Sequence, residues 1–149
     1  MYKRQEALAI FYKIFSNEAL VIDKWFALQA GASDRGGNIL PTVRQLLQHP
    51  DFSIKNPNRA RSLVFSYCNA NPGAFHRSDA AGYVFWSDRV LEMDATNPQV
   101  AARLARALDR WSHLAEPYRS AAKVAIERVA AKPDLSNDVR EVVSRALSQ

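Results

Sequence analysis

Residues 97–108, NPQVAARLARAL, contain the pattern that decides the fold. Asn97 is a typical helix N-cap, and Pro98 suits the first helical position because its missing N–H would have no partner there. Apolar side chains then recur at the spacing of one helical face: Val100, Leu104, Ala107, Leu108 and Trp111. This stretch predicts an amphipathic helix.

A second stretch has a similar pattern. PTVRQLLQ (41–48) and PQVAARLA (98–105) both open on proline and place apolar residues at matching positions. This similarity favours stacked helix pairs of the HEAT or armadillo kind, whose repeats are about 40–47 residues long. Two short matches leave an irregular helical bundle as the alternative.

Helical periodicity extends over most of the remaining chain and is interrupted by short polar breaks. The first stripe is Ala7, Ile10, Phe11, Ile14 and Phe15, and a later one is Tyr83, Trp86, Val90 and Met93. The second stripe favours a helix over the short strand that YVFW (83–86) could form. Helices are predicted near residues 7–15, 18–30, 42–48, 56–69, 80–95, 97–111, 116–131 and 137–147. In the second of these helices we expect Leu20, Val21, Trp25 and Leu28 to face the core. We therefore predict one all-α domain over residues 1–149, with about seven or eight helices.

Composition restricts the function classes. The chain has 48% hydrophobic residues, 5 glycines and a net charge of +5, and its Lys and Arg residues are scattered. This distribution does not indicate a nucleic-acid-binding surface. Its single cysteine, Cys68, excludes an intramolecular disulfide and a cysteine-based zinc site. No apolar run approaches the roughly 18 residues that span a bilayer. We expect a soluble, cytoplasmic protein without a membrane partner.

Residues with catalytic potential do not form a recognisable set. His49, His76 and His113 belong to no H-E-x-x-H pair, and none has a partner at i+3 or i+4 that could share a metal. We expect all three, and Cys68 on its apolar helix, to be structural. Arg103, Arg106 and Arg110 lie on one side of a helix together with Gln99. They form either a solvated face or a positive strip directed at a partner or cavity.

The start of the helix at residues 56–63, NPNRARSL, contains a local conflict. Asn56 and Pro57 suit a helix N-terminus, but Arg59 and Arg61 follow within the first two turns. The positive end of the helix dipole disfavours cations there. Such a conflict is often a sign of function.

Four stretches together resemble the C-terminal domain of bacterial aminopeptidase N, a family of zinc metallo-aminopeptidases of the gluzincin type. They are DKWFALQA (23–30), NPNRARSLVFSYCNANPGAFH (56–76), GYVFW (82–86) and NPQVAARLARAL (97–108). The resemblance extends from about Ala7 to the end, so Met1 and Tyr2 are candidates for residues added in cloning. It implies a right-handed superhelix of HEAT or armadillo-like helix pairs that closes over a catalytic domain and encloses the active-site cavity.

The resemblance also implies where the chemistry lies. The family's H-E-x-x-H zinc site and G-A-M-E-N motif belong to upstream domains, and this sequence contains neither. The chain is then a non-catalytic part of a larger enzyme, with no cofactor of its own and zinc in the parent protein. Its expected partners are the upstream domains of the same chain and a peptide substrate. The alternative is a free-standing HEAT-like scaffold that binds protein or nucleic acid through a basic groove.

Three residues are expected to contact the substrate on the strength of the resemblance. They are Arg61 of NPNRAR, and Gln99 and Arg103 of NPQVAAR. Gln99 and Arg103 are i, i+4 neighbours, so they share a helical face. Arginines there could donate charge-assisted hydrogen bonds to a backbone carbonyl or terminal carboxylate of a peptide. Arg59 is expected to form a structural ion pair instead.

Overall fold

The computed structural model describes residues 2–15 and 18–149, and all regular structure in these ranges is helical. The α-helices are α1 (Tyr2–Phe15), α2 (Ala19–Ala30), α3 (Ile39–Leu46), α4 (Pro57–Ala60), α5 (Ser66–Cys68), α6 (Pro72–Phe75), α7 (Ala81–Asp94), α8 (Pro98–Ala105), α9 (Tyr118–Ala130) and α10 (Asn137–Leu147). A π-helical segment, Arg61–Phe65, joins α4 to α5, and two 3₁₀ turns, Arg106–Leu108 and Trp111–His113, follow α8.

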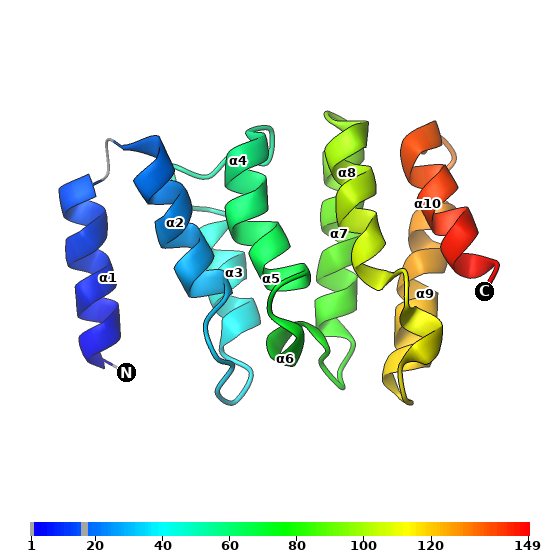
Figure 1. Cartoon of the computed structure of the whole chain (residues 1–149), viewed down its shortest axis with the longest axis horizontal. Helices are drawn as coiled ribbons and strands as arrows, with labels where there is room; N and C mark the ends of the chain where they lie inside the picture. Colours follow the sequence, from blue (N-terminus) through cyan, green and yellow to red (C-terminus); the bar gives the residue numbers. More distant parts are fainter. Residues whose placement is uncertain (1, 16–17) are drawn as a thin grey trace.

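The helices stack in two layers along the long axis of the molecule (Figure 1). Helices α2, α4–α5, α8 and α10 form the layer facing the viewer, and α3, α7 and α9 lie behind them. Each front helix packs against a neighbouring rear helix, as in α7 with α8 and α9 with α10. This arrangement confirms the predicted all-α fold of HEAT or armadillo-like helix pairs, and it places YVFW (83–86) in helix α7.

The number of helices and some of their ends differ from the sequence prediction. With α4–α5 counted once, the described residues contain nine α-helices, because α6 forms where only a break was expected. Helix α5 ends at Cys68, and the Asn71-Pro72 pair starts α6, since proline suits a first helical turn. Helix α3 starts at Ile39 rather than Thr42, because the Asp34 carboxylate accepts a hydrogen bond from the Ile39 N–H at 3.1 Å. Helix α8 ends at Ala105 rather than near Trp111.

The orientation predicted for two apolar side chains of α2 is wrong. Leu20 is 79% exposed and Leu28 is 46% exposed, whereas Trp25 is buried as expected. The buried face consists of Ile22, Trp25, Phe26, Gln29 and Ala30. ALVIDKWFALQA is apolar on nearly every side, so its periodicity does not select one face. In the N-terminal stripe, Ile10 is 59% exposed, while the side chains of Ile14 and Phe15 lie outside the described residues.

Three tryptophans connect neighbouring elements of the stack through their indole N–H groups. Trp25 donates to the Leu8 carbonyl at 2.9 Å, Trp86 to the Leu104 carbonyl at 2.8 Å, and Trp111 to the Ala146 carbonyl at 2.9 Å. Each bond satisfies a buried polar group while the ring fills the space between two helices. Trp86 thereby fixes α8 against the rear helix α7, and Trp111 fixes α10 against the 3₁₀ turn that follows α8.

The described helices are not of the kind that span a membrane. Over residues 2–15 and 18–149, every helix is too short or too polar to cross a lipid bilayer.

Candidate functional site

A hollow of about 430 Å³ lies between α8 and α10 on the front layer. One wall is formed by Gln99, Arg103 and Arg106, and the other by Asp138, Glu141 and Arg145. Ala102 and Val142 form its apolar floor. The structure therefore brings two of the three predicted substrate-binding residues, Gln99 and Arg103, into one concave site.

The local sequence determines which face of α8 lines the hollow. The Asn97 side chain accepts a hydrogen bond from the Val100 N–H at 3.3 Å, and Pro98 occupies the first turn, as predicted. Ala101, Leu104 and Ala105 are buried against the neighbouring helices. Gln99, Arg103 and Arg106 lie on the opposite side, which faces the hollow.

Helix α10 is held in place by a relay of hydrogen bonds from α7. The buried Asp94 carboxylate accepts from both the N–H and the hydroxyl of Ser136. The Ser136 oxygen accepts in turn from the Val139 N–H at 3.2 Å, which caps α10. Because one carboxylate anchors the cap, the first turn of α10 and its Asp138 have a defined position beside α8.

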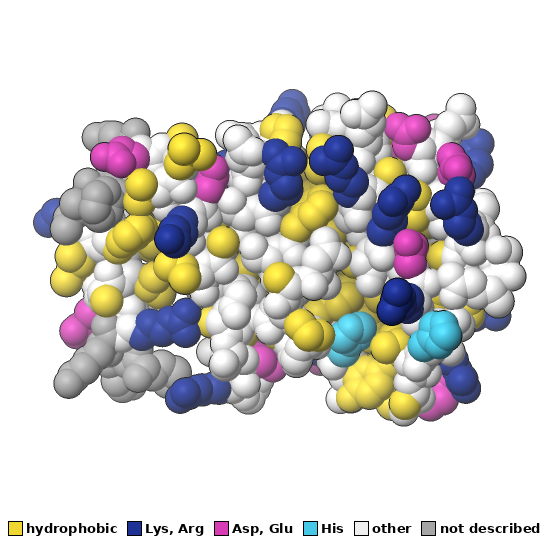
Figure 2. Space-filling model, viewed as in Figure 1, with side chains coloured by type: hydrophobic (Ala, Val, Ile, Leu, Met, Phe, Trp, Pro, Cys, Tyr) yellow, Lys and Arg dark blue, Asp and Glu magenta, His cyan; other side chains and the backbone are white. Residues whose placement is uncertain are grey.

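The charges in the hollow are unequally paired. Arg145 donates to Glu141 at 2.7 Å. Arg103 and Arg106 are exposed, and neither guanidinium group has a hydrogen bond or a carboxylate within ion-pair distance among the described residues. Arg106 interacts electrostatically with Asp109. Partial burial raises the pKa of the Asp109 carboxyl group, and Arg106 and Arg145 partly oppose that rise. Figure 2 shows Lys and Arg side chains spread over this face, with acidic side chains between them.

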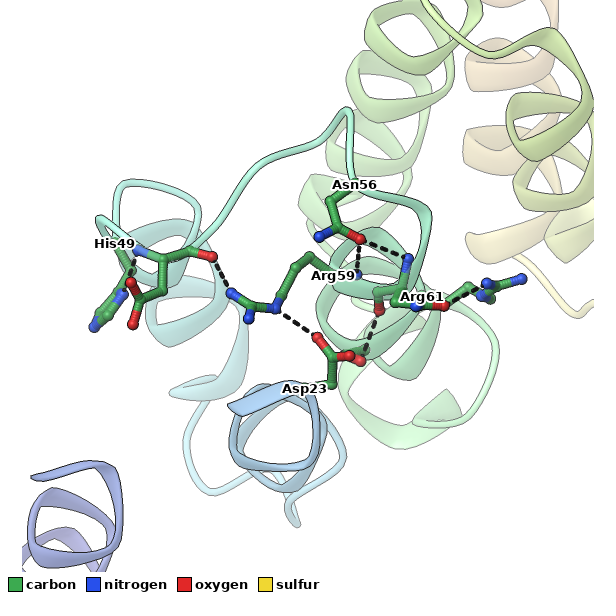
Figure 3. A network of polar contacts seen from close by, with 8 residues as sticks. Asp23, His49, Asn56, Arg59 and Arg61 are labelled. Carbon is green, nitrogen blue, oxygen red and sulfur yellow. Dashed lines mark hydrogen bonds and ion pairs between the residues drawn. The ribbon is translucent and has the colours of Figure 1, made fainter. Parts of the chain in front are cut away.

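Arg61, the third predicted residue, does not line this hollow. It is exposed at the start of the π-helical segment on the neighbouring front helix, and its guanidinium donates to the Asn58 side-chain oxygen at 2.6 Å. Figure 3 shows it pointing away from the pair formed by Asp23 and Arg59. Arg61 thus shares a layer with Gln99 and Arg103 but not their pocket.

Arg59 is structural, as expected. Its Nε donates to the Asp23 carboxylate at 2.6 Å, and its Nη1 donates to the Asp51 carbonyl (Figure 3). The guanidinium also lies 5.9 Å from the centre of the Phe26 ring. The side chains of Arg59 and Asp23 are only 12% and 13% exposed. These contacts offset the unfavourable helix dipole, which accounts for an arginine in the first turn.

The π-helical turn at Arg61–Phe65 was not predicted. It widens the helix by one residue just after the NPNRA cap, so Arg61 and the buried side chains that follow it no longer have α-helical spacing. Nothing in RSLVF distinguishes it by composition from an ordinary α-helical turn. Such turns occur frequently at functional sites.

Two of the histidines, His49 and His76, and the buried Cys68 have structural roles. The His49 ring accepts a hydrogen bond from the Asp51 N–H at 3.1 Å, and the His76 ring is bonded to the Tyr83 hydroxyl at 2.7 Å. Burial lowers the pKa of His76 and raises the pKa of the buried Cys68 thiol, so the neutral form of each is favoured. Within the described ranges, no group of three His, Cys, Asp or Glu side chains could hold a metal ion.

Sequence similarity agrees with this architecture. A family of ARM-repeat domains, described as a domain of unknown function (DUF3458_C), matches residues 1–148. The chain belongs to this ARM-repeat family. The predicted HEAT or armadillo-like repeats are therefore confirmed by both sequence and structure.

Members of the family occur within aminopeptidases. The chain is 42% identical over 144 residues to aminopeptidase N of Caulobacter vibrioides and to that of Haemophilus influenzae, in each case covering 97% of this chain and 16% of the relative. It is 40% identical over 129 residues to the Escherichia coli aminopeptidase N, covering 87% of this chain and 15% of that protein. The resemblance to aminopeptidase N is thereby confirmed, and the chain spans about one sixth of the length of these relatives.

A solved structure has the same ARM-repeat arrangement. The crystal structure of Legionella pneumophila aminopeptidase A, in complex with aspartic acid, superposes with a TM-score of 0.91 at 26% sequence identity. The match covers 99% of this chain and 17% of the Legionella chain. The fold described above is therefore a recurrent part of larger aminopeptidases.

The hollow also corrects and extends the predicted set of residues. Arg110 was placed on the same strip as Arg103 and Arg106, but it does not line the hollow. The 3₁₀ turn after Ala105 changes the number of residues per turn, so Arg110 leaves that face. The residues of α10 were missed: their i, i+3, i+7 spacing at Asp138, Glu141 and Arg145 marks the polar face of an amphipathic helix, but nothing in the sequence shows which helix it faces.

Proposed function

We propose that this chain is the non-catalytic C-terminal domain of a cytoplasmic zinc aminopeptidase that removes N-terminal residues from peptides. In this proposal the upstream domains of the same chain hold the zinc ion, which polarises the scissile carbonyl group. The ARM-repeat domain covers the catalytic domain and encloses the active-site cavity. The similarity to aminopeptidase N over 97% of the chain supports this assignment.

The domain's own residues would bind the peptide beyond the scissile bond. Arg103 is suited to donate paired hydrogen bonds to a carboxylate or a backbone carbonyl, because its guanidinium is exposed and has no acidic partner among the described residues. The Gln99 amide, one turn earlier on the same face, can donate and accept. Arg61 would contact a more distant part of the same peptide from the neighbouring front helix. The observation that carries the proposal is the shared hollow of Gln99 and Arg103.

Arg103→Ala in the full-length enzyme tests this role. We expect KM for tri- and tetrapeptides to rise about tenfold or more, because a charge-assisted hydrogen bond contributes about 1.5–3 kcal/mol. KM for a single-residue chromogenic amide, which does not extend into the hollow, should change less than about twofold. Steady-state kinetics on both substrate types measures the difference.

The matched control is Arg119→Ala. Arg119 is an exposed arginine at the start of α9 and pairs with Glu116 at 3.0 Å, outside the hollow. It should leave both KM values unchanged. Equal effects of Arg103→Ala on peptides and on the chromogenic amide would show that Arg103 does not contact the peptide.

A further inference from the structure

Arg106 is a second unpaired cation in the hollow. It lies three residues after Arg103, so the two guanidinium groups project from neighbouring positions on the same side of the helix. Both side chains are exposed, and neither guanidinium group has an ion pair or hydrogen bond within the part of the chain that the structure describes. Two adjacent arginines that form no ion pair repel each other, so an anion that contacts both would be stabilised.

The carboxylates around the hollow do not form ion pairs with Arg103 or Arg106. Glu141 is paired with Arg145 at 2.7 Å. Asp138 lies in the first turn of α10, where the helix dipole stabilises its negative charge. Asp109 interacts electrostatically with Arg106, but it does not line the hollow and lies beyond ion-pair distance of the Arg106 guanidinium group. With three arginines against two carboxylates, the hollow retains a net positive charge.

The volume of the hollow suits a small group of a ligand. Its volume of about 430 Å³ falls in the lower part of the range for small-molecule sites. That space suits one terminal amino-acid residue, with its main-chain carboxylate and its side chain, better than a long segment of peptide. The apolar floor of Ala102 and Val142 is suited to the methylene groups of such a side chain.

We propose that Arg103 and Arg106 together bind a peptide end that carries two carboxylates, one on the main chain and one on an Asp or Glu side chain. Arg106 is then a specificity-determining residue for acidic residues downstream of the scissile bond. This inference rests on the proposed function, because it requires the peptide to reach the hollow. It adds a substrate class to the binding role given to Arg103.

The test compares two nearly isosteric peptides in the full-length enzyme. Ala-Ala-Asp and Ala-Ala-Asn differ at the side-chain terminus, where a carboxylate is replaced by a neutral amide. We expect the wild-type enzyme to have a KM about three- to tenfold lower for the Asp peptide, since the exposed site is partly screened by solvent. Arg106→Gln should bring the KM ratio of the two peptides to about one, whereas Arg106→Lys should keep part of the preference.

The outcomes separate this inference from the function on which it depends. A wild-type enzyme without the Asp preference, or an Arg106→Gln variant that retains it, would overturn the role of Arg106. If this happens while Arg103→Ala still raises KM for peptides alone, the proposed function stands. If Arg103→Ala affects peptides and chromogenic amides equally, the proposed function fails first. Arg119→Gln is the matched control and should leave the Asp/Asn ratio at its wild-type value.

Discussion

Gly82→Ala is expected to lower the free energy of unfolding of the 149-residue chain by about 3 kcal/mol or more. Gly82 lies in the first turn of α7, directly against the chain that leaves α6. A Cβ atom there would overlap the Phe75 carbonyl oxygen and would lie 3.1 Å from the Phe75 carbonyl carbon and 3.2 Å from the Tyr67 hydroxyl. Because the obstacle is backbone, no side-chain rotation can relieve the overlap.

A glycine in the preceding helix provides the control for this effect. Gly73 in α6 has no atom within 4 Å of an added Cβ, apart from its own neighbourhood in the chain. Gly73→Ala should therefore change the stability by less than about 1 kcal/mol, and in the stabilising direction if it restricts the unfolded chain. Urea unfolding of both variants measures the difference. Equal midpoints for Gly82→Ala and Gly73→Ala would contradict the close packing of α6 on α7.

Arg59→Met is expected to lower the free energy of unfolding by about 2–3 kcal/mol. The substitution keeps an unbranched apolar stem but removes the donors to Asp23 and to the Asp51 carbonyl. The Asp23 carboxylate, only 13% exposed, then loses its cation, and such a group is costly to leave unpaired. Urea or thermal unfolding should show the loss directly.

A double variant separates the lost ion pair from lost packing. Asp23→Leu/Arg59→Met removes both charges, so it should be more stable than Arg59→Met alone. For comparison, Arg119→Met breaks the exposed pair with Glu116, whose side chains are 50% and 47% exposed, and should cost less than about 1 kcal/mol. A double variant no more stable than Arg59→Met would show that the pair does not explain the effect.

Much of the fold is predictable from local sequence. Helices α7 and α10 follow from clear apolar stripes, and α10 also follows from the Ser136 cap that precedes it and ends where the pattern ends. Local sequence does not predict which face of helix α2 is buried. Because α2 is apolar on nearly all sides, packing against its neighbouring helices decides which side chains face the core. Ile22 and Phe26 are buried there, while Leu20 and Leu28 remain exposed. That choice depends on tertiary packing, which is partly fixed by the Asp23–Arg59 pair.

The site is predictable only in part, because one of its walls depends on tertiary packing. Gln99 and Arg103 share a face of α8 by spacing alone, and the structure confirms that they lie together. The partner wall on α10 depends on the Asp94–Ser136 contact, which joins residues 42 positions apart and has no local signature. Arg61 remains a separate exposed residue beside a π-helical turn that its sequence does not indicate.

The most direct test of the central claim is a crystal structure of the full-length enzyme with a non-hydrolysable tripeptide bound. We expect the main-chain carboxylate or a backbone carbonyl of the peptide within about 3 Å of the Arg103 guanidinium, with Gln99 also in hydrogen-bonding contact. An ordered peptide that approaches the active site without contacting Gln99, Arg103 or Arg61 would contradict the proposal that this ARM-repeat domain binds substrate.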